Sequence, residues 1–189
     1  ATHPYAVIVT KTIKEACAAA NCKYLRFLRQ ESSTDDCIQV DSYQEAVEFL
    51  NHVEGNIFLT TGSNNLEFFT KLTDYQNRIT VRILPMQNSL EKALQLRYKP
   101  TNIICMQGPF SEALNIAMFK DSKAKYIVTK DSGNAGGFEE KKKAAMAAGA
   151  RLIVIKREPE YEGVDFADIL AKIEEICTKK YGAGEAVDC

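Results

Sequence analysis

The amino-acid sequence predicts an α/β fold in which a parallel sheet carries helices on both faces, as in flavodoxin-like or Rossmann-like domains. From residue 56 onward, short apolar segments alternate with helical segments, which is the pattern of successive βαβ units. Gly, Ser, Asn and Gln gather after three of the apolar segments, as expected of loops that lead from a strand into a helix. Of the 189 residues, 46% are hydrophobic and 26% are charged, the ordinary balance of a globular protein.

The first half of the chain predicts three helices and three strands. Pro4 suits a first helical turn, and apolar residues recur after it at helical spacing. Ser42 and Glu45 form a capping box that opens the second helix, and Pro85 ends the third strand. The predicted elements are, in order, a helix over 4–22, a strand over 23–29, a helix over 42–53, a strand over 56–60, a helix over 65–72 and a strand over 78–84.

The second half continues the alternation. Ser89, Ser111 and Asp165 each precede a helical segment and have side chains that cap helix N-termini. Residues 181–189 are predicted to form a loose tail. The predicted elements are a helix from residue 89, a strand over 102–106, a helix over 112–119, a strand over 126–129, a helix over 138–148, a strand over 152–155 and a helix over 165–179.

Charge and cysteine usage exclude several classes of function. The chain has 24 Lys and Arg against 25 Asp and Glu, so it lacks the basic excess of a nucleic-acid-binding protein. Its apolar runs are shorter than the roughly 18 residues of a membrane helix, and no signal peptide is visible. The six cysteines form no CxxC pair and only two histidines are present, which argues against a metal site. Scattered cysteines of this kind favour reduced thiols and a cytoplasmic location.

Three loops are predicted to meet at one edge of the sheet, because parallel strands end on the same side. After the strand over 56–60, Gly62 and Ser63 suit an anionic ligand. The alternative for this short stretch is a turn with a helix cap. After the strand over 102–106, Gln107, Gly108 and Ser111 form a similar candidate, for which the alternative is a rigid connecting loop.

The third loop, residues 130–137, is the strongest local signal. It is longer than the usual two to six residues of such loops, and it matches neither a Walker A loop nor a G-x-G-x-x-G fingerprint. Lys130 can meet a carboxylate or a phosphate, and the glycines let the loop close over a ligand. A surface loop without function is the alternative. The candidate binding residues are Asp131, Ser132, Gly133, Gly136 and Gly137.

Thr2 and His3 stand at the start of the first predicted helix. The helix dipole biases a histidine there toward the neutral form, which can donate or accept a hydrogen bond. A capping residue on the surface is the ordinary alternative. Lys130 and His3 are the candidate catalytic residues, and Thr2 is a candidate binding residue.

Taken together, these motifs resemble the precorrin-6A reductase family of cobalamin biosynthesis, in its aerobic or its cobalt-containing anaerobic branch. The resemblance spans nearly the whole chain and depends on the order of short pieces. They are Ala1-Thr2-His3-Pro4-Tyr5-Ala6, Tyr24-Leu25-Arg26, Thr61-Gly62-Ser63, Arg82-Ile83-Leu84-Pro85, Met106-Gln107-Gly108-Pro109-Phe110-Ser111 with Asn115, Thr129-Lys130-Asp131-Ser132-Gly133, and Gly136-Gly137-Phe138 with Glu140-Lys141.

The resemblance implies two α/β domains with a cleft between them. It also implies hydride transfer from NADPH or NADH to a carbon–carbon double bond of a tetrapyrrole, with the carboxylates of the ring met by local donors. It does not indicate whether the substrate carries cobalt, and the oligomeric state stays open.

One departure concerns the family's Gly-rich phosphate-binding turn, which lies upstream of the matching motifs and has no counterpart in this chain. We therefore expect an N-terminally truncated chain that is inactive alone. Residues 1–52 would be a remnant of the N-terminal domain, 53–180 the C-terminal domain and 181–189 the tail. Two alternatives remain: a non-catalytic flavodoxin-like module that binds a tetrapyrrole or a phosphate ligand, and an unrelated α/β transferase.

Overall fold

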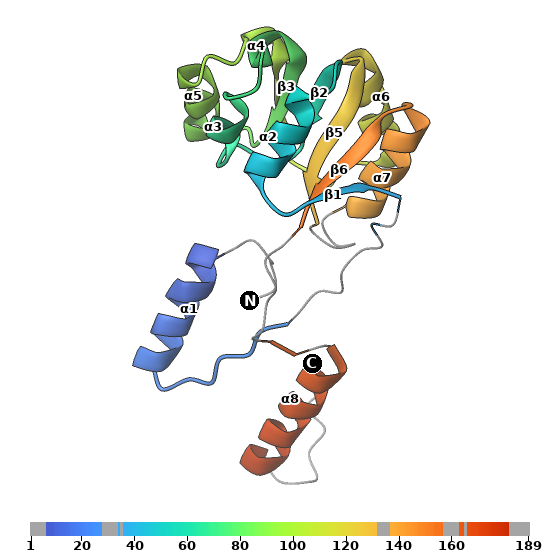
Figure 1. The fold of residues 1–189 in the computed structure, drawn as a ribbon. Coiled ribbons are helices and arrows are strands. Elements are labelled where there is room, and N and C mark those ends of the chain that lie inside the picture. Colours follow the sequence, from blue (N-terminus) through green and yellow to red (C-terminus); the bar gives the residue numbers. More distant parts are fainter. Residues whose placement is uncertain are drawn as a thin grey trace. The chain divides into compact units, whose positions relative to one another are not determined.

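The structure is a computed structural model that describes residues 7–27, 34, 36–131, 137–156, 163–164 and 166–181. The chain forms two compact units. The larger is Glu31–Arg157, and the smaller combines Ala1–Gln30 with Glu158–Cys189. Figure 1 shows the helices and strands of both units.

The larger unit contains a six-stranded sheet in the order β1-β6-β5-β2-β3-β4, with every pair of neighbouring strands parallel. The predicted parallel sheet is therefore confirmed. The strands are β1 (Ile38–Val40), β2 (Asn56–Leu59), β3 (Ile79–Ile83), β4 (Ile103–Cys105), β5 (Ala124–Lys130) and β6 (Arg151–Ile155).

Helices cover both faces of this sheet, as predicted. Helices α2 (Tyr43–Asn51), α3 (Leu66–Phe69) and α5 (Gln87–Gln95) contribute to one hydrophobic cluster, and α6 (Glu112–Asp121) and α7 (Phe138–Ala147) to the other. Two short elements, α4 (Tyr75–Arg78) and η1 (Pro100–Asn102), precede β3 and β4.

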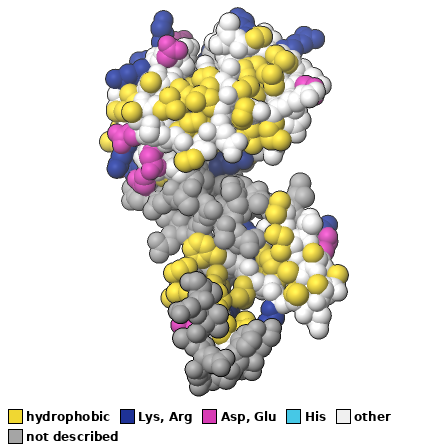
Figure 2. All heavy atoms as spheres, turned by 180° about the vertical axis from the view of Figure 1, so that it is seen from behind, with side chains coloured by type: hydrophobic (Ala, Val, Ile, Leu, Met, Phe, Trp, Pro, Cys, Tyr) yellow, Lys and Arg dark blue, Asp and Glu magenta, His cyan; other side chains and the backbone are white. Residues whose placement is uncertain are grey.

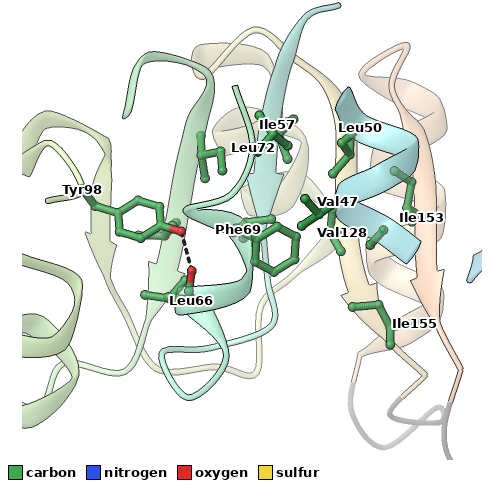
Figure 3. Close-up of a cluster of buried hydrophobic side chains, with 14 of the residues drawn as sticks. Val47, Leu50, Ile57, Leu66, Phe69, Leu72, Tyr98, Val128, Ile153 and Ile155 are labelled. Atoms are coloured by element: carbon green, nitrogen blue, oxygen red, sulfur yellow. Dashed lines mark hydrogen bonds between the residues drawn. The ribbon is translucent and has the colours of Figure 1, made fainter. Parts of the chain in front are cut away.

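The larger cluster lies on the α2 face. Figure 3 shows Val47 and Leu50 of α2 directed toward Val128 and Ile153 of the sheet. Beside them, the buried Tyr98 hydroxyl donates a 2.9 Å hydrogen bond to the Leu66 carbonyl of α3. Because α3 is a single turn, this bond and its buried leucine hold the helix against the sheet.

The second cluster lies on the opposite face and is built around aromatic rings. Phe58 of β2 and Phe119 of α6 are fully buried and meet edge to face, with ring centroids 5.0 Å apart. Phe138, Ala144 and Ala145 of α7 complete this cluster. The two faces of β2 therefore belong to different cores, as expected of a strand in the interior of a doubly covered sheet.

The smaller unit contains α1 (Val7–Ala19) and α8 (Phe166–Tyr181). Between them, Phe27 and Val164 form a single parallel bridge. The strand predicted over 23–29 is thus reduced to one bridge, and its last two residues lie outside the described residues. Across the described residues of the chain, none of the helices has the length and apolar character needed to cross a membrane.

Other predictions differ from the structure because contacts between distant segments, rather than the local sequence, determine these features. Strand β1 was not predicted, since its three residues are specified by pairing with β6 rather than by a local pattern. That pairing also moves the boundary, because the expected border between residues 52 and 53 falls inside the larger unit. Helix α5 begins at Gln87 rather than at Ser89, which is buried within it.

Two of the capping predictions, those at Ser42 and Ser111, are confirmed. The Ser42 hydroxyl accepts a 3.1 Å hydrogen bond from the Glu45 backbone N–H, and the Glu45 carboxylate accepts one of 2.7 Å from the Asp41 N–H. Ser111 caps α6 by accepting a 3.2 Å bond from the Leu114 N–H.

Hydrophobic atoms also gather on the outer surface of the larger unit (Figure 2). Met86, Leu90 and Leu94 follow one another at intervals of a helical turn along α5, and each is at least 38% exposed. Leu84 and Met106 are exposed immediately after β3 and β4. The carboxyl edge of the sheet is therefore partly apolar.

We predict that Tyr98→Phe lowers the free energy of unfolding by about 1–2 kcal/mol, because it leaves the buried Leu66 carbonyl without a donor. Urea unfolding measures this change. Tyr75→Phe is the matched control, since the Tyr75 hydroxyl also donates to a carbonyl, that of Leu96, at 2.8 Å but in a half-buried place that water can reach. Equal losses in the two variants would contradict the role given to Tyr98.

Candidate functional site

The direct pairing of β2 with β5 places the topological switch point of the sheet at their carboxyl ends. The chain leaves β2 toward α3 on one face, and leaves β5 toward α7 on the opposite face. In open α/β sheets the crevice between two such departing loops is the place where ligands bind. The loops after Thr60 and Thr129 are therefore neighbours, and the loop after Met106 shares their edge, as predicted.

The β2 loop carries a polar group that lacks a partner. Thr60 ties the loop to β5, because its N–H and its hydroxyl donate to the Val128 carbonyl at 2.9 and 3.1 Å. The next residue, Thr61, is 6% exposed, and its buried Oγ1 makes no hydrogen bond in the described structure. A buried hydroxyl without a partner is costly, so Thr61 Oγ1 is poised for a ligand.

Gly62 and Ser63 follow in the same loop. Gly62 has φ +79°, and a Cβ built there would meet nothing within 4 Å. Its glycine is required by the backbone conformation, and the space beside it is open for a ligand to approach. Ser63 instead uses its hydroxyl to donate a 3.1 Å hydrogen bond to the buried Ser89 of α5. Ser63 therefore fixes the loop to the neighbouring helix.

Lys130 and Asp131 stand at the end of β5, beside this loop. Lys130 is half-buried, and desolvation lowers the pKa of its ammonium. Its Nζ lies 5.9 Å from the centre of the Tyr43 ring. Tyr43 is itself held by a 2.8 Å hydrogen bond from Asn65, and burial raises its pKa to about 12. The site thus has a cation supported by a fixed aromatic ring, and no local sequence pattern indicated Tyr43.

The β4 loop lies farther along the same edge. Three strand spacings separate β5 from β4, a distance of about 14 Å. Gln107 is exposed, and Ser111 is engaged as the α6 cap. Gly108 has a role in packing, because a Cβ there would come 2.9 Å from the Phe110 ring. These three predicted binding residues therefore do not gather around Lys130.

A cluster that sequence reasoning missed lies on the α6 and α7 face of the same edge. Arg82 of β3 is 7% exposed, its Nη1 donates a 2.8 Å hydrogen bond to Asn115 Oδ1, and its guanidinium stacks 3.8 Å from the centre of the Phe110 ring. Lys141 of α7 is also buried, with 9% of its surface exposed. The resemblance included all four residues, but nothing local indicates that a strand arginine points into the protein.

Burial perturbs both cations, and the charge of Arg82 further perturbs Lys141. Desolvation lowers the pKa of Arg82 to about 10. Desolvation, and then the charge of Arg82, lower the pKa of Lys141 to about 8, against weaker opposing effects of Glu140 and Asp131. Asp131 is buried and lies near Lys141, so this cluster and the β5 end form one continuous polar region.

Several predicted site residues lie outside the described residues: Thr2, His3, Ser132, Gly133 and Gly136. Gly137 is described, and it occupies the position before α7 with φ +68°. A cleft of about 380 Å³ lies elsewhere, between β1, β6 and α7, and its lining includes Asp36, Lys142 and Arg151. Among the predicted site residues that the structure describes, none lines that cleft.

The fold and the site define a class: a doubly wound α/β unit whose switch point carries a buried hydroxyl and a desolvated ammonium. Comparison with known proteins then gives the family. The chain belongs to the precorrin-6x reductase CbiJ/CobK family, whose model matches residues 1–177.

Curated relatives and a solved structure agree with this assignment. The chain is 36% identical over 160 residues to a cobalt-precorrin-6A reductase of Methanothermobacter thermautotrophicus, covering 83% of this chain and 53% of the relative. It is 34% identical to a cobalt-precorrin-6A reductase of Priestia megaterium, covering 93% of this chain and 69% of the relative. A solved structure of CobK precorrin-6A reductase has a TM-score of 0.68 at 20% identity, covering 98% of this chain and 74% of that one, which shows a shared fold. The chain spans about half the length of the first relative, and the comparisons do not bear out the expected truncation.

We predict that Thr61→Val leaves the melting temperature unchanged or raises it. The substitution removes a buried hydroxyl that lacks a partner, a group that costs up to about 1–3 kcal/mol. Thr60→Val is the matched control, because the Thr60 hydroxyl is bonded, and its loss should cost about 0.5–1.5 kcal/mol. Calorimetry compares the two variants. A clear loss of stability in Thr61→Val would show that the hydroxyl has a structural partner.

We predict that stability rises with pH more steeply in the wild type than in Lys141→Met between pH 8 and 10. The pKa of Lys141 is about 8 in the folded protein and 10.5 ordinarily, so in this window the unfolded state binds more protons and rising pH favours folding. The difference accumulates to the order of 1–3 kcal/mol. Urea unfolding at several pH values measures it, and parallel curves would contradict a desolvated ammonium.

Proposed function

We propose that this protein is a reductase of corrin-ring biosynthesis that converts precorrin-6A, in its cobalt-containing form, to the 6B form. The family assignment supports this reaction, and the names of the Methanothermobacter and Priestia relatives favour the cobalt-containing substrate. The structural observation that carries the proposal is the unpartnered Thr61 hydroxyl on the loop after β2, which lies beside the Lys130 ammonium at the end of the paired strand β5. We also propose a cytoplasmic location, which the scattered placement of the six cysteines in the sequence favours.

The described residues fit the anionic groups that this reaction brings. Thr61 Oγ1 is a buried hydroxyl in need of a partner, and the space beside Gly62 is open. NADPH or NADH, when bound, supplies the hydride. The chain's own task is to bind and orient, which Thr61 performs by hydrogen bonding and Gly62 by allowing close backbone approach.

The flat ring also needs an apolar surface. Leu84, Met86 and Met106 provide one at the carboxyl edge, where they are exposed by 38% or more. Methionine side chains adapt to irregular partners, and binding sites combine such apolar surfaces with a few polar groups. The arrangement therefore suits a macrocycle whose carboxylates surround an apolar body.

Reduction of a carbon–carbon double bond needs a proton as well as a hydride. We propose that Lys130 Nζ holds this proton, because burial lowers its pKa below that of an ordinary ammonium and so makes the proton easier to release. His3 remains a second candidate donor from the sequence.

An anaerobic assay tests the proposal. The purified protein is incubated with cobalt-precorrin-6A or precorrin-6A and with NADPH or NADH, and the product is analysed by mass spectrometry. A gain of two hydrogens with oxidation of the cofactor supports the reductase. Tight binding of the ring without any turnover would instead favour a non-catalytic tetrapyrrole-binding module.

We predict that Lys130→Ala lowers kcat/KM at least about tenfold, the effect of losing a charge-assisted contact of roughly 1.5–3 kcal/mol, while the melting temperature changes little. Lys125→Ala is the matched control, since Lys125 is exposed and lies at the other end of the same strand. It should keep both activity and stability. A destabilised Lys130→Ala variant with full turnover would make Lys130 structural.

A further inference from the structure

The two edges of the six-stranded sheet differ in how they are protected against pairing with another chain. Charged residues and prolines on or beside an edge strand oppose such pairing. At the β1 edge, Asp36 precedes the strand and pairs with Lys142 at 3.6 Å. Asp41 follows the strand and pairs with Lys156 at 2.8 Å. Strand β4 forms the other edge, and its sequence, Ile103-Ile104-Cys105, contains no charge and no proline.

The backbone of β4 offers a donor and an acceptor at its outer edge. The Met106 N–H donates to the Ile83 carbonyl of β3 at 3.0 Å, and successive residues of a strand direct their backbone groups to alternate sides. The N–H and carbonyl of Cys105 are therefore directed away from β3. Among the described residues, no hydrogen bond outside the sheet ladders uses them. Ile103 shares this direction, but its N–H donates to the Pro100 carbonyl.

An apolar stripe of α5 lies on the side of this edge. The buried Ser89 and Ala93 mark the side of α5 that faces the sheet. Lys92 lies about 100° from Ala93 around the helix, and it is directed at α3, because its Nζ pairs with a glutamate there at 2.9 Å. Leu90 and Leu94 each follow a buried position, so they project in the opposite sense, away from α3. Since α5 connects β3 to β4, that direction is toward the edge, and the two leucines are 38% and 43% exposed.

We propose that β4 and α5 form the interface of a homodimer, in which the β4 strands of two copies pair antiparallel about a two-fold axis at Cys105. A second copy supplies the same unused donor and acceptor, and a residue on such an axis exchanges two hydrogen bonds with its own copy. The absence of charge from β4 favours this partner, because in a two-fold interface each charge near the axis faces the same charge. With the axis perpendicular to the sheet, the two α5 helices lie antiparallel on one face, and Leu90 and Leu94 line the seam between them.

Sedimentation velocity of the 189-residue chain in reducing buffer tests the proposal. The wild type should form a species with twice the mass of one chain that dissociates on dilution. Leu90→Glu places two like charges at the seam and removes apolar contact, so it should raise the dissociation constant at least about tenfold. Met146→Glu is the matched control, because Met146 is an apolar residue of α7 that is 68% exposed beside β6 rather than β4. This variant should keep the dissociation constant of the wild type.

Cross-linking tests the position of the axis. A residue on the axis of an antiparallel pair has its Cα about 5.5 Å from that of its copy. A short bismaleimide should therefore join Cys105 to Cys105 of the second copy and give a covalent dimer. Cys105→Ser should abolish this product. Cys22→Ser, which removes another exposed thiol, should leave it unchanged.

Three results would overturn the proposal. They are a wild type that stays monomeric at every concentration, a Leu90→Glu variant that associates as tightly as the wild type, and a covalent dimer that survives Cys105→Ser. The last two would mean that association uses another surface. If circular dichroism shows that Leu90→Glu does not fold, Leu90→Ser takes its place and should also weaken association. None of these measurements depends on turnover, so failure of the reductase assay would leave the dimer unaffected.

Discussion

The parallel pairing of β2 with β5 is the constraint on which the remaining structure depends. The chain builds outward from β2 through β3 to β4, returns to the other side of β2 as β5, and then continues to β6. Strands are thus added on one side of β2 up to β4 and on its other side from β5 onward. For this reason the helices that follow β2 and β5 pack on opposite faces of the sheet. The two loops therefore part at the carboxyl ends of these strands, where ligands bind in open α/β sheets. Thr61 and Lys130 lie there for this topological reason.

Buried charge is the second organising feature, and it opposes stability. Arg82, Lys141 and Lys130 all have pKa values lowered by desolvation, so each is less favourable in the folded protein than in water. Such costs are usually retained where function requires them. Hydrophobic packing on both faces of the sheet must supply the stability, and the rings of Phe58 and Phe119 do so directly beneath Arg82.

The sequence predicted those parts of the fold that local patterns specify. Alternation of apolar and helical segments located five of the six strands, and side-chain chemistry located the caps at Ser42 and Ser111. Strand β1 was not predicted, because a strand of three residues is too short to show an alternating pattern of its own. It depends on pairing with β6. The candidate site divides in the same way. Loop position indicated Gly62 and Lys130, whereas Tyr43 and Arg82 lie near them only because side chains from distant elements converge.

The near-zero net charge of the chain makes the placement of individual cations important for binding an anionic ligand. With 24 basic and 25 acidic residues, the protein has no large net charge with which to attract a ligand bearing many negative groups. Recognition must come instead from a few cations placed where water is scarce and each interaction is strong. Arg82 and Lys141 are buried cations on one side of the edge, and Lys130 is a half-buried cation at the switch point.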